Sequence, residues 1–205
     1  GRDDLVLGNL GLNSYIKATA DGPARLYVHD FGLNGVLKQI LTTYKNGVSY
    51  PIAGRDEIVR PIPSLRSKFP SYKAFGASRV EDIFSSADLS AARVLEARML
   101  GSAVAIARAD GGFDLRLLPA EAQFAPPFAA VTADFDADGK ADLLVGGNFF
   151  GVTPMRGRYD AGYGLLLRGD GQGGLAAVDM QESGVMIPGQ VRALLPVRTA
   201  RGSAI

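Results

Sequence analysis

The sequence predicts a mainly β protein built from repeated four-stranded antiparallel sheets. Three observations support this fold class. The 26 glycines and 11 prolines interrupt short apolar runs and leave few long helical periods. Two stretches of the chain align with each other around an Asp-Phe pair and a glycine, and the beginning of the chain matches the middle of the same repeat.

The repeat begins with a hairpin that has an elaborated loop. The segment RLYVHDFGLNGVLKQILTTY (residues 25–44) aligns with AVTADFDADGKADLLVGGNF (residues 130–149), so that Asp30 falls on Asp134 and Gly35 on Gly139. In both segments, an apolar strand leads to an Asp-Phe pair, a turn closes on glycine, and a second apolar strand follows. Downstream, residues 101–119 parallel residues 162–180 as strand, Asp-Gly turn and strand. Each repeat therefore has four strands, which is typical of a β-propeller blade.

The ends of the chain also fit the repeat. GRDDLVLGN (residues 1–9) matches GKADLLVGGN (residues 139–148), and QVRALLPV (residues 190–197) resembles a first strand. Propellers need roughly four to eight blades, so we expect the chain to be a segment of a longer protein. The expected organisation is a partial blade at 1–24, a blade at 25–119 with a helical insertion at about 54–100, a blade at 128–181 and a partial blade at 190–205.

The expected insertion at residues 54–100 is far longer than an ordinary connection. Two stretches, VEDIF (residues 80–84) and DLSAARVLEARML (residues 88–100), carry apolar residues at helical spacing, with Asp88 as a helix cap. The earlier part is basic and is broken by prolines. Such an insertion either carries a contact surface or only caps one end of the propeller. The side chains that we predict to contact a partner protein are Arg60, Arg66, Lys68, Tyr72, Lys73 and Phe75.

The composition limits the function classes. The 22 Lys and Arg residues nearly balance the 21 Asp and Glu residues, so a general attraction to nucleic acid or to an anionic membrane is not expected. The chain has no cysteine, which excludes disulfides, thiolate metal sites and cysteine nucleophiles. No apolar run reaches the roughly 18 residues that a membrane-spanning helix needs. The amino terminus lacks the basic-then-apolar order of a signal peptide, so an export signal would have to lie upstream.

The strongest motif is an acidic loop, DFDADGKADLLVG (residues 134–146). Carboxylates at alternate positions converge on one point, and glycine permits the sharp turn that follows them. A set of oxygen ligands at this spacing suits Ca²⁺, and a turn whose carboxylates only cap backbone amides is the alternative. The predicted ligands are the side chains of Asp134, Asp136, Asp138 and Asp142 and the backbone carbonyl of Lys140.

The related loop DFGLNGVLK (residues 30–38) departs from this pattern, because Gly32 and Lys38 replace the third and ninth positions. The Lys38 ammonium could take the place of a cation, so we expect this loop to be free of metal.

Several other features have structural interpretations. The Arg-Gly-Asp triplet at residues 168–170 lies where the repeat requires a Gly-Asp-Gly turn. His29 is the only histidine, and no nucleophile motif accompanies it. The segment MRGRYDAGYG (residues 155–164) could form a polar binding face or could pack between blades.

These motifs together resemble the FG-GAP/VCBS repeats of propeller proteins. The segments LVLGNLGLNS, YKNGVSYPIAGRDE, IPSLRSKF, EDIF and GGNFFGV with GRYDAGYG resemble the carboxy-terminal part of large bacterial VCBS-repeat proteins related to the ASPIC/UnbV group. The resemblance implies an exported propeller that acts in binding or assembly, with calcium held by the acidic loop.

We therefore expect a non-catalytic, calcium-stabilised propeller that contacts other proteins of a larger assembly in the bacterial cell envelope, with or without association of that assembly with a membrane. The expected location is outside the cytoplasm: periplasmic, associated with the outer membrane, or secreted. The alternative is a propeller module of an extracytoplasmic enzyme or glycan-binding protein. The sequence shows no convincing pair of catalytic acids beyond the acidic loop, and it indicates no particular small-molecule ligand.

Overall fold

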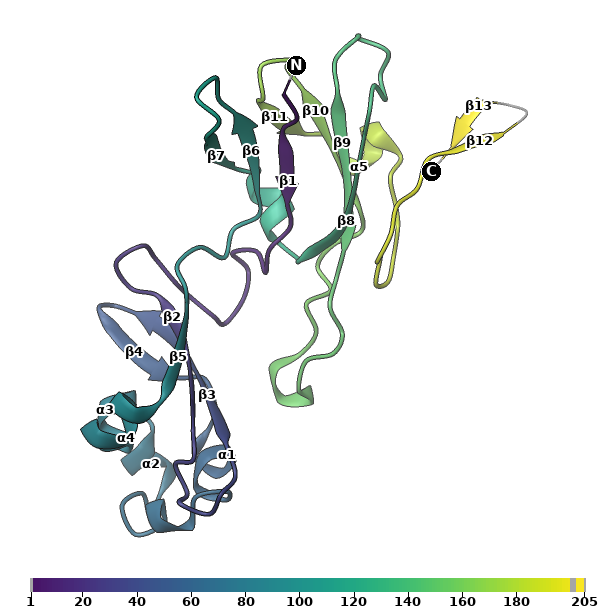
Figure 1. Ribbon diagram of the computed structural model, residues 1–205. Helices are drawn as coiled ribbons and strands as arrows, with labels where there is room; N and C mark the ends of the chain where they lie inside the picture. Colours follow the sequence, from purple (N-terminus) through teal and green to yellow (C-terminus); the bar gives the residue numbers. More distant parts are fainter. Residues whose placement is uncertain (1, 200–201, 205) are drawn as a thin grey trace. The chain divides into compact units, whose positions relative to one another are not determined.

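The computed structural model describes residues 2–199 and 202–204. The chain forms two compact units (Figure 1). Unit 1 contains Gly1–Ser14 and Gly101–Ile205, and unit 2 contains Tyr15–Leu100. In the sequence, unit 2 is therefore inserted between two parts of unit 1.

Unit 1 contains two main antiparallel sheets. The smaller sheet has the order β1-β6-β7 and consists of β1 (Leu5–Leu7), β6 (Ala103–Ala107) and β7 (Phe113–Leu117). The larger sheet has the order β11-β10-β9-β8 and consists of β8 (Pro127–Ala133), β9 (Asp142–Gly147), β10 (Leu165–Gly169) and β11 (Leu175–Ala177). In the larger sheet, each strand pairs with the next one in the sequence.

One apolar cluster joins these two sheets. Val104 lies on β6, Leu143 and Val145 lie on β9, and Leu167 lies on β10; all four belong to one buried cluster. Strand residues alternate between the two faces of a sheet, so Val6 of β1 and Ile106 of β6 also pack on this cluster. The two sheets of unit 1 therefore share a core.

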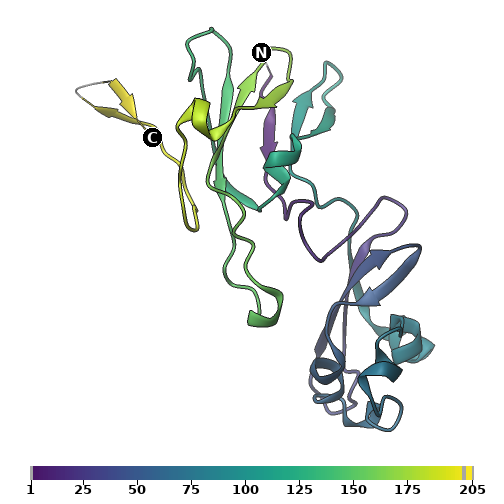
Figure 2. The same ribbon diagram turned by 180° about the vertical axis from the view of Figure 1, so that it is seen from behind.

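Short elements complete unit 1. They are η2 (Ala120–Gln123), η3 (Pro154–Arg156), α5 (Met180–Ser183) and the hairpin of β12 (Val197–Thr199) with β13 (Gly202–Ala204). The segment after α5 runs beside the larger sheet, where the Val191 N–H donates to the Gly147 carbonyl at 2.8 Å (Figure 2).

Gln123 holds together the two places where the chain leaves and re-enters unit 1. Its backbone carbonyl accepts the N–H groups of Leu12 and Asn13 at 3.0 and 3.2 Å. Its side-chain amide accepts the Ser102 N–H at 2.8 Å and donates to the Ser102 carbonyl at 2.9 Å. Gln123 is buried, so these hydrogen bonds supply partners for its own carbonyl and amide groups, which water does not reach.

Unit 2 is built on a sheet with the order β4-β3-β2-β5. Its strands are β2 (Ala24–His29), β3 (Lys38–Lys45), β4 (Val48–Pro51) and β5 (Arg93–Ala97). Asn46 and Gly47 join β3 to β4 with φ angles of 52° and 80°. This pair of left-handed residues is the preferred connection in a tight antiparallel hairpin, and Asn-Gly suits it best.

Short helices connect β4 to β5 in unit 2. They are α1 (Arg55–Val59), η1 (Pro63–Leu65), α2 (Tyr72–Phe75), α3 (Val80–Ile83) and α4 (Ser86–Ala91). Ser71 and Ser85 cap α2 and α4 by accepting the N–H groups of Ala74 and Asp88. The cap of α4 is therefore Ser85, and the prediction of Asp88 as the cap is wrong.

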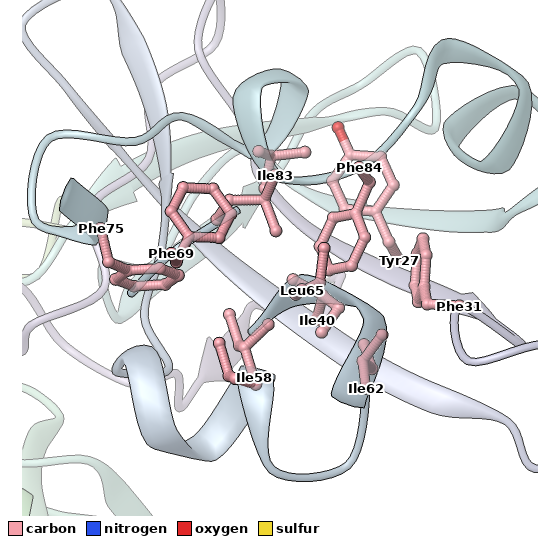
Figure 3. Close-up of a cluster of buried hydrophobic side chains, with 12 residues drawn as sticks. Tyr27, Phe31, Ile40, Ile58, Ile62, Leu65, Phe69, Phe75, Ile83 and Phe84 are labelled. Atoms are coloured by element: carbon pink, nitrogen blue, oxygen red, sulfur yellow. The ribbon is translucent and has the colours of Figure 1, made fainter. Parts of the chain in front are cut away.

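The helical segment forms most of the core of unit 2 (Figure 3). Tyr27, Phe31 and Ile40 come from the strands β2 and β3 and from the loop between them. The remaining members come from the helical segment and are Ile58, Val59, Ile62, Leu65, Phe69, Phe75, Val80, Ile83 and Phe84. Burial of these side chains drives the packing of the helices against the sheet.

The mainly β fold with antiparallel sheets is confirmed, but the predicted boundaries differ from the observed ones. The repeat pattern predicts one blade at residues 25–119 and a partial blade at residues 1–24. Instead, β6 pairs with both β1 and β7, and β2 pairs with both β3 and β5. The sheets of the described residues form no closed propeller. The larger sheet of unit 1 lies within the range 128–181 except for its first residue, Pro127.

The predicted insertion at 54–100 also needs correction. Its last part is not helical, because residues 93–97 form β5 and pair with β2 over the register Ala24↔Ala97 to Val28↔Arg93. Pairing along a whole strand outweighs the helical spacing of the apolar residues. Of the partial blade predicted at 190–205, the described part has strands only at 197–199 and 202–204; residues 200, 201 and 205 lie outside the described part.

Candidate functional site

The acidic loop between β8 and β9 is a turn held by its own carboxylates. Asp134 accepts the N–H groups of Asp138 and Gly139 at 3.1 and 2.9 Å, and Asp138 accepts the Lys140 N–H at 2.9 Å. Gly139 has a φ of 84°, a conformation that glycine adopts without steric cost. The turn brings one carboxylate oxygen from each of Asp134, Asp136 and Asp138 within 4.8 Å of one another. These three residues are thus gathered as the sequence predicts.

Two cationic side chains also lie on this group of carboxylates. Lys140 donates to Asp138 at 2.9 Å, and Arg168 donates to Asp136 at 2.7 Å and to Glu182 at 2.9 Å. The hydrogen bond from Lys140 lowers the pKa of Asp138, and the same contact raises the pKa of Lys140. Hydrogen bonds to Glu182 and then Asp136 raise the pKa of Arg168. These ion pairs are exposed and water screens them, so they hold the Lys140 and Arg168 side chains only weakly.

Asp142 occupies a different position from the one that the sequence predicts. Its side chain is 1% exposed, and its two oxygens accept the N–H groups of Phe135 and Gly169, both at 2.9 Å. It is not a member of the group of three carboxylates. Both of its oxygens satisfy backbone donors at the edge of the core, so Asp142 acts here as a buried brace between the loop and β10.

Asp4 repeats half of this brace in the smaller sheet of unit 1. Its carboxylate accepts the Ala107 N–H at 2.8 Å, at the end of β6, as Asp142 does from Gly169 at the end of β10. The alignment of residues 1–9 with residues 139–148 places Asp4 on Asp142. The alignment in the sequence is therefore the signal that indicates this role for Asp4.

The related loop in unit 2 has the same hydrogen-bond pattern without the acidic group. Asp30 accepts the N–H groups of Asn34 and Gly35 at 3.1 and 2.6 Å, and Asn34 accepts the Val36 N–H at 3.2 Å. Desolvation raises the pKa of Asp30, but these backbone hydrogen bonds outweigh it, and the net pKa is lowered. The Lys38 ammonium donates to the Val36 carbonyl at 3.3 Å, so its hydrogen bond goes to the backbone.

The residues predicted to contact a partner protein lie in two different environments. Arg60, Arg66, Lys68 and Lys73 are exposed, although the Lys68 ammonium also donates to the Ile83 carbonyl at 3.3 Å. Phe75 lies in the core of unit 2 instead. Its side chain is 8% exposed, and its ring packs edge-on against that of Phe69, with the ring centres 5.3 Å apart. The prediction of Phe75 as a surface anchor is therefore wrong.

Tyr72 remains on the surface of unit 2, where it is 67% exposed. Its hydroxyl donates to Asp56, which lowers the pKa of that carboxyl and raises the pKa of Tyr72. The Arg55 guanidinium lies 5.6 Å from the centre of the Tyr72 ring. Its neighbours thus hold the exposed ring in place.

The Arg-Gly-Asp triplet is part of a turn, as its place in the repeat predicts. Asp170 accepts the N–H groups of Gln172 and Gly174 at 2.6 and 2.8 Å, and these hydrogen bonds lower its pKa. Because Arg168 lies against the acidic loop, the two charged side chains of the triplet are both committed to contacts within unit 1.

Residues 126–167 match the FG-GAP repeat. The matched segment contains β8, the acidic loop, β9 and the first part of β10. Neither the search of curated proteins nor the search of solved structures gave a match. The FG-GAP repeat indicates a propeller-like module of the kind that takes part in protein interactions. Among the described residues, no helix has the length and apolar character needed to cross a membrane.

Proposed function

We propose that this chain is part of a β-propeller that binds other proteins of a larger assembly in the bacterial cell envelope, outside the cytoplasm, and that calcium stabilises its acidic loop. The role is non-catalytic. The proposal is supported by the FG-GAP repeat at residues 126–167 and by the likeness of the longer motifs to bacterial VCBS-repeat proteins related to the ASPIC/UnbV group. The single observation that carries the calcium site is the convergence of Asp134, Asp136 and Asp138.

The donor set of the acidic loop fits a hard cation. Asp134, Asp136 and Asp138 offer carboxylate oxygens, and the Lys140 backbone carbonyl is the further ligand that the spacing predicts. A bound Ca²⁺ would offset the repulsion among the three carboxylates. Without Ca²⁺, Arg168 and Lys140 partly offset that repulsion. Their ion pairs with Asp136 and Asp138 are exposed, so water competes with them easily. Asp142 would hold the loop against β10 from the buried side.

An exposed apolar face supports the propeller part of the proposal. On the smaller sheet of unit 1, one face carries large side chains that are between 38% and 56% exposed: Leu5, Leu7, Phe113, Leu115 and Leu117. The opposite face of the same sheet packs on the larger sheet through Val6, Val104 and Ile106. A further sheet stacked on the exposed face would bury it in the same way, as neighbouring blades do.

Calcium is expected to raise the thermal stability of unit 1, because Ca²⁺ binds the folded loop better than the unfolded chain. At a hundredfold excess of Ca²⁺ over its dissociation constant, the gain is about 2.7 kcal/mol. Melting is measured by circular dichroism with calcium and with chelator. Asp136→Ala should abolish the calcium-dependent shift, whereas Asp30→Ala in the related loop of unit 2 should leave it unchanged. An equal shift in wild type and in Asp136→Ala would rule out this site.

The protein-binding part of the proposal assigns contacts to the basic segment of unit 2, which we define as Arg60, Arg66, Lys68 and Lys73. With Tyr72 beside them, these exposed cations suit an acidic surface on a partner. Charges at the edge of such a contact mainly govern the rate of encounter, and a buried ring mainly governs the lifetime.

Reversing the charges of the basic segment is expected to remove the partner. The full chain is immobilised, envelope proteins are passed over it, and retained proteins are identified by mass spectrometry. The triple variant Arg60→Glu, Arg66→Glu and Lys73→Glu should lose specific partners that the wild type retains, and Lys45→Glu, also exposed in unit 2, should keep them. Retention by wild type should fall when the salt concentration rises from about 50 to about 300 mM. The same retained proteins on all three chains would contradict this assignment.

A further inference from the structure

The connection between β9 and β10 is an ordered hairpin, here named the β9–β10 hairpin and defined as residues 148–164. It extends well beyond the larger sheet of unit 1 (Figure 1), and it is longer than the two to five residues usual between paired strands. Phe149 and Tyr159 face each other across it and exchange two backbone hydrogen bonds at 2.8 and 3.0 Å. Long ordered connections of this kind often carry binding residues.

The base of the hairpin is fixed by buried hydrogen bonds. Asn148 is 2% exposed, and its side chain donates to the carbonyls of Gly162 and Gly189 at 2.6 and 2.8 Å and accepts the Gly162 N–H at 3.0 Å. The Phe150 N–H donates to the Gln190 side chain at 2.9 Å. A hairpin held in this way is ordered before any partner arrives, so binding costs less conformational entropy.

The surface beside the hairpin combines aromatic rings with arginines. Phe128 and Phe149 are 49% and 36% exposed, and their ring centres are 6.2 Å apart. The Arg192 guanidinium lies 4.0 Å from the centre of the Phe128 ring, and the Arg158 guanidinium lies 4.9 Å from that of Phe150. Met155, near the tip, is 80% exposed. Phenylalanine, methionine and arginine are enriched at the centres of protein interfaces.

This surface has a surplus of positive charge. The only carboxylate within the β9–β10 hairpin is Asp160. Among the described residues, no carboxylate forms an ion pair with Arg158 or Arg192. Arg192 instead donates to the Asn148 carbonyl at 2.9 Å and to the Gln190 side chain at 2.6 Å, and these contacts leave its charge uncompensated.

We propose that the β9–β10 hairpin, together with Phe128 and Arg192, binds an acidic segment of a partner protein that also carries apolar side chains. Carboxylates would pair with the two stacked guanidiniums, and apolar side chains would cover the exposed rings and Met155. A protein segment fits better than a nucleic acid or a glycan, because bases and sugars bind by stacking on ring faces and the arginines already cover faces of Phe128 and Phe150. This surface shares no residue with the basic segment of unit 2 and needs no calcium.

A displayed library of random 12-residue peptides, selected on the full chain, tests the proposal. Retained peptides should be rich in Asp and Glu beside Phe, Leu or Tyr. One retained peptide, carrying a fluorophore, is then titrated by anisotropy. Arg158→Glu should weaken its binding at least about tenfold, and Arg158→Lys should weaken it much less. Lys45→Glu reverses an exposed charge that belongs neither to this surface nor to the basic segment of unit 2, so it is the matched control and should bind as wild type does.

The Arg158 guanidinium lies on the surface against the Phe150 ring, so we expect Arg158→Glu to fold, and circular dichroism checks this. Met155→Asp is the second variant, since it places a carboxylate at the most exposed apolar position of the surface, and it should also weaken binding. Four results would overturn the proposal: a library that retains nothing, retained peptides without acidic residues, equal affinity in both hairpin variants and wild type, or tighter binding of a 12-nucleotide oligothymidine than of the peptide.

Discussion

Replacing Tyr15–Leu100 by a short glycine-serine linker is expected to leave unit 1 folded, whereas deleting residues 54–100 is expected to unfold unit 2. The first change removes unit 2 whole, and Leu12, Asn13 and Ser102 all stay bonded to Gln123. The second change removes β5 and every helix of unit 2, leaving only Tyr27, Phe31 and Ile40 of the buried cluster. The sheet would then expose its apolar face to water.

Hydrogen exchange followed by mass spectrometry separates the two outcomes. In the first variant, the amides of β9 and β10 should keep the protection that they have in the wild type. In the second variant, the amides of β2 and β3 should lose protection, while those of β9 and β10 keep it. Protection of β2 and β3 after removal of residues 54–100 would show that the helical segment is a detachable insertion.

Phe75→Ala is expected to lower the free energy of unfolding of unit 2 by about 3–5 kcal/mol. Phe75 is 8% exposed and packs edge-on against Phe69, so truncation removes buried apolar area and leaves a cavity among neighbours that cannot fully close it. The loss is large compared with the marginal stability of a unit of this size.

Tyr72→Ala is the matched control, because Tyr72 is an aromatic residue of the same helix but is 67% exposed. Its truncation should change the stability by less than about 1 kcal/mol. Urea unfolding, followed by exchange protection of amides in unit 2, measures both variants. Similar losses for the two variants would contradict the distinction between a buried Phe75 and an exposed Tyr72.

The local features of the fold could be predicted from the sequence because they depend on nearby residues. The Asp-Phe pair and glycine at residues 134–139 define a turn whose hydrogen bonds span at most five residues. The same pattern at Asp30 gives the same turn in unit 2. The convergence of Asp134, Asp136 and Asp138 follows directly from that turn.

The distant pairings could not be predicted in this way. β1 pairs with β6 across the whole of unit 2, and nothing in either strand specifies which of two similar repeats it joins. Residues 93–97 have apolar residues at helical spacing, and only the pairing with β2 makes them a strand. Asp142 lies at a ligand position by spacing, but two backbone amides, one of them on β10, determine where its carboxylate goes. In each case, a contact between segments far apart in the sequence outweighs the local pattern.

The hydrogen bonds of Gln123 allow the segment between residues 15 and 100 to be replaced during evolution. The two chain segments that lead into and out of unit 2 are both bonded to one buried residue, one through its backbone carbonyl and the other through its side chain. The rest of unit 1 therefore does not depend on what residues 15–100 contain. Asn148 closes the β9–β10 hairpin at the equivalent connection of the larger sheet in a similar way. Where a buried polar residue bonds both ends of a connection in this way, recombination can insert, remove or replace a whole domain in that connection. The core of the repeat then needs no compensating substitutions. The same property marks residues 15–100 as a position where a foreign domain could be grafted.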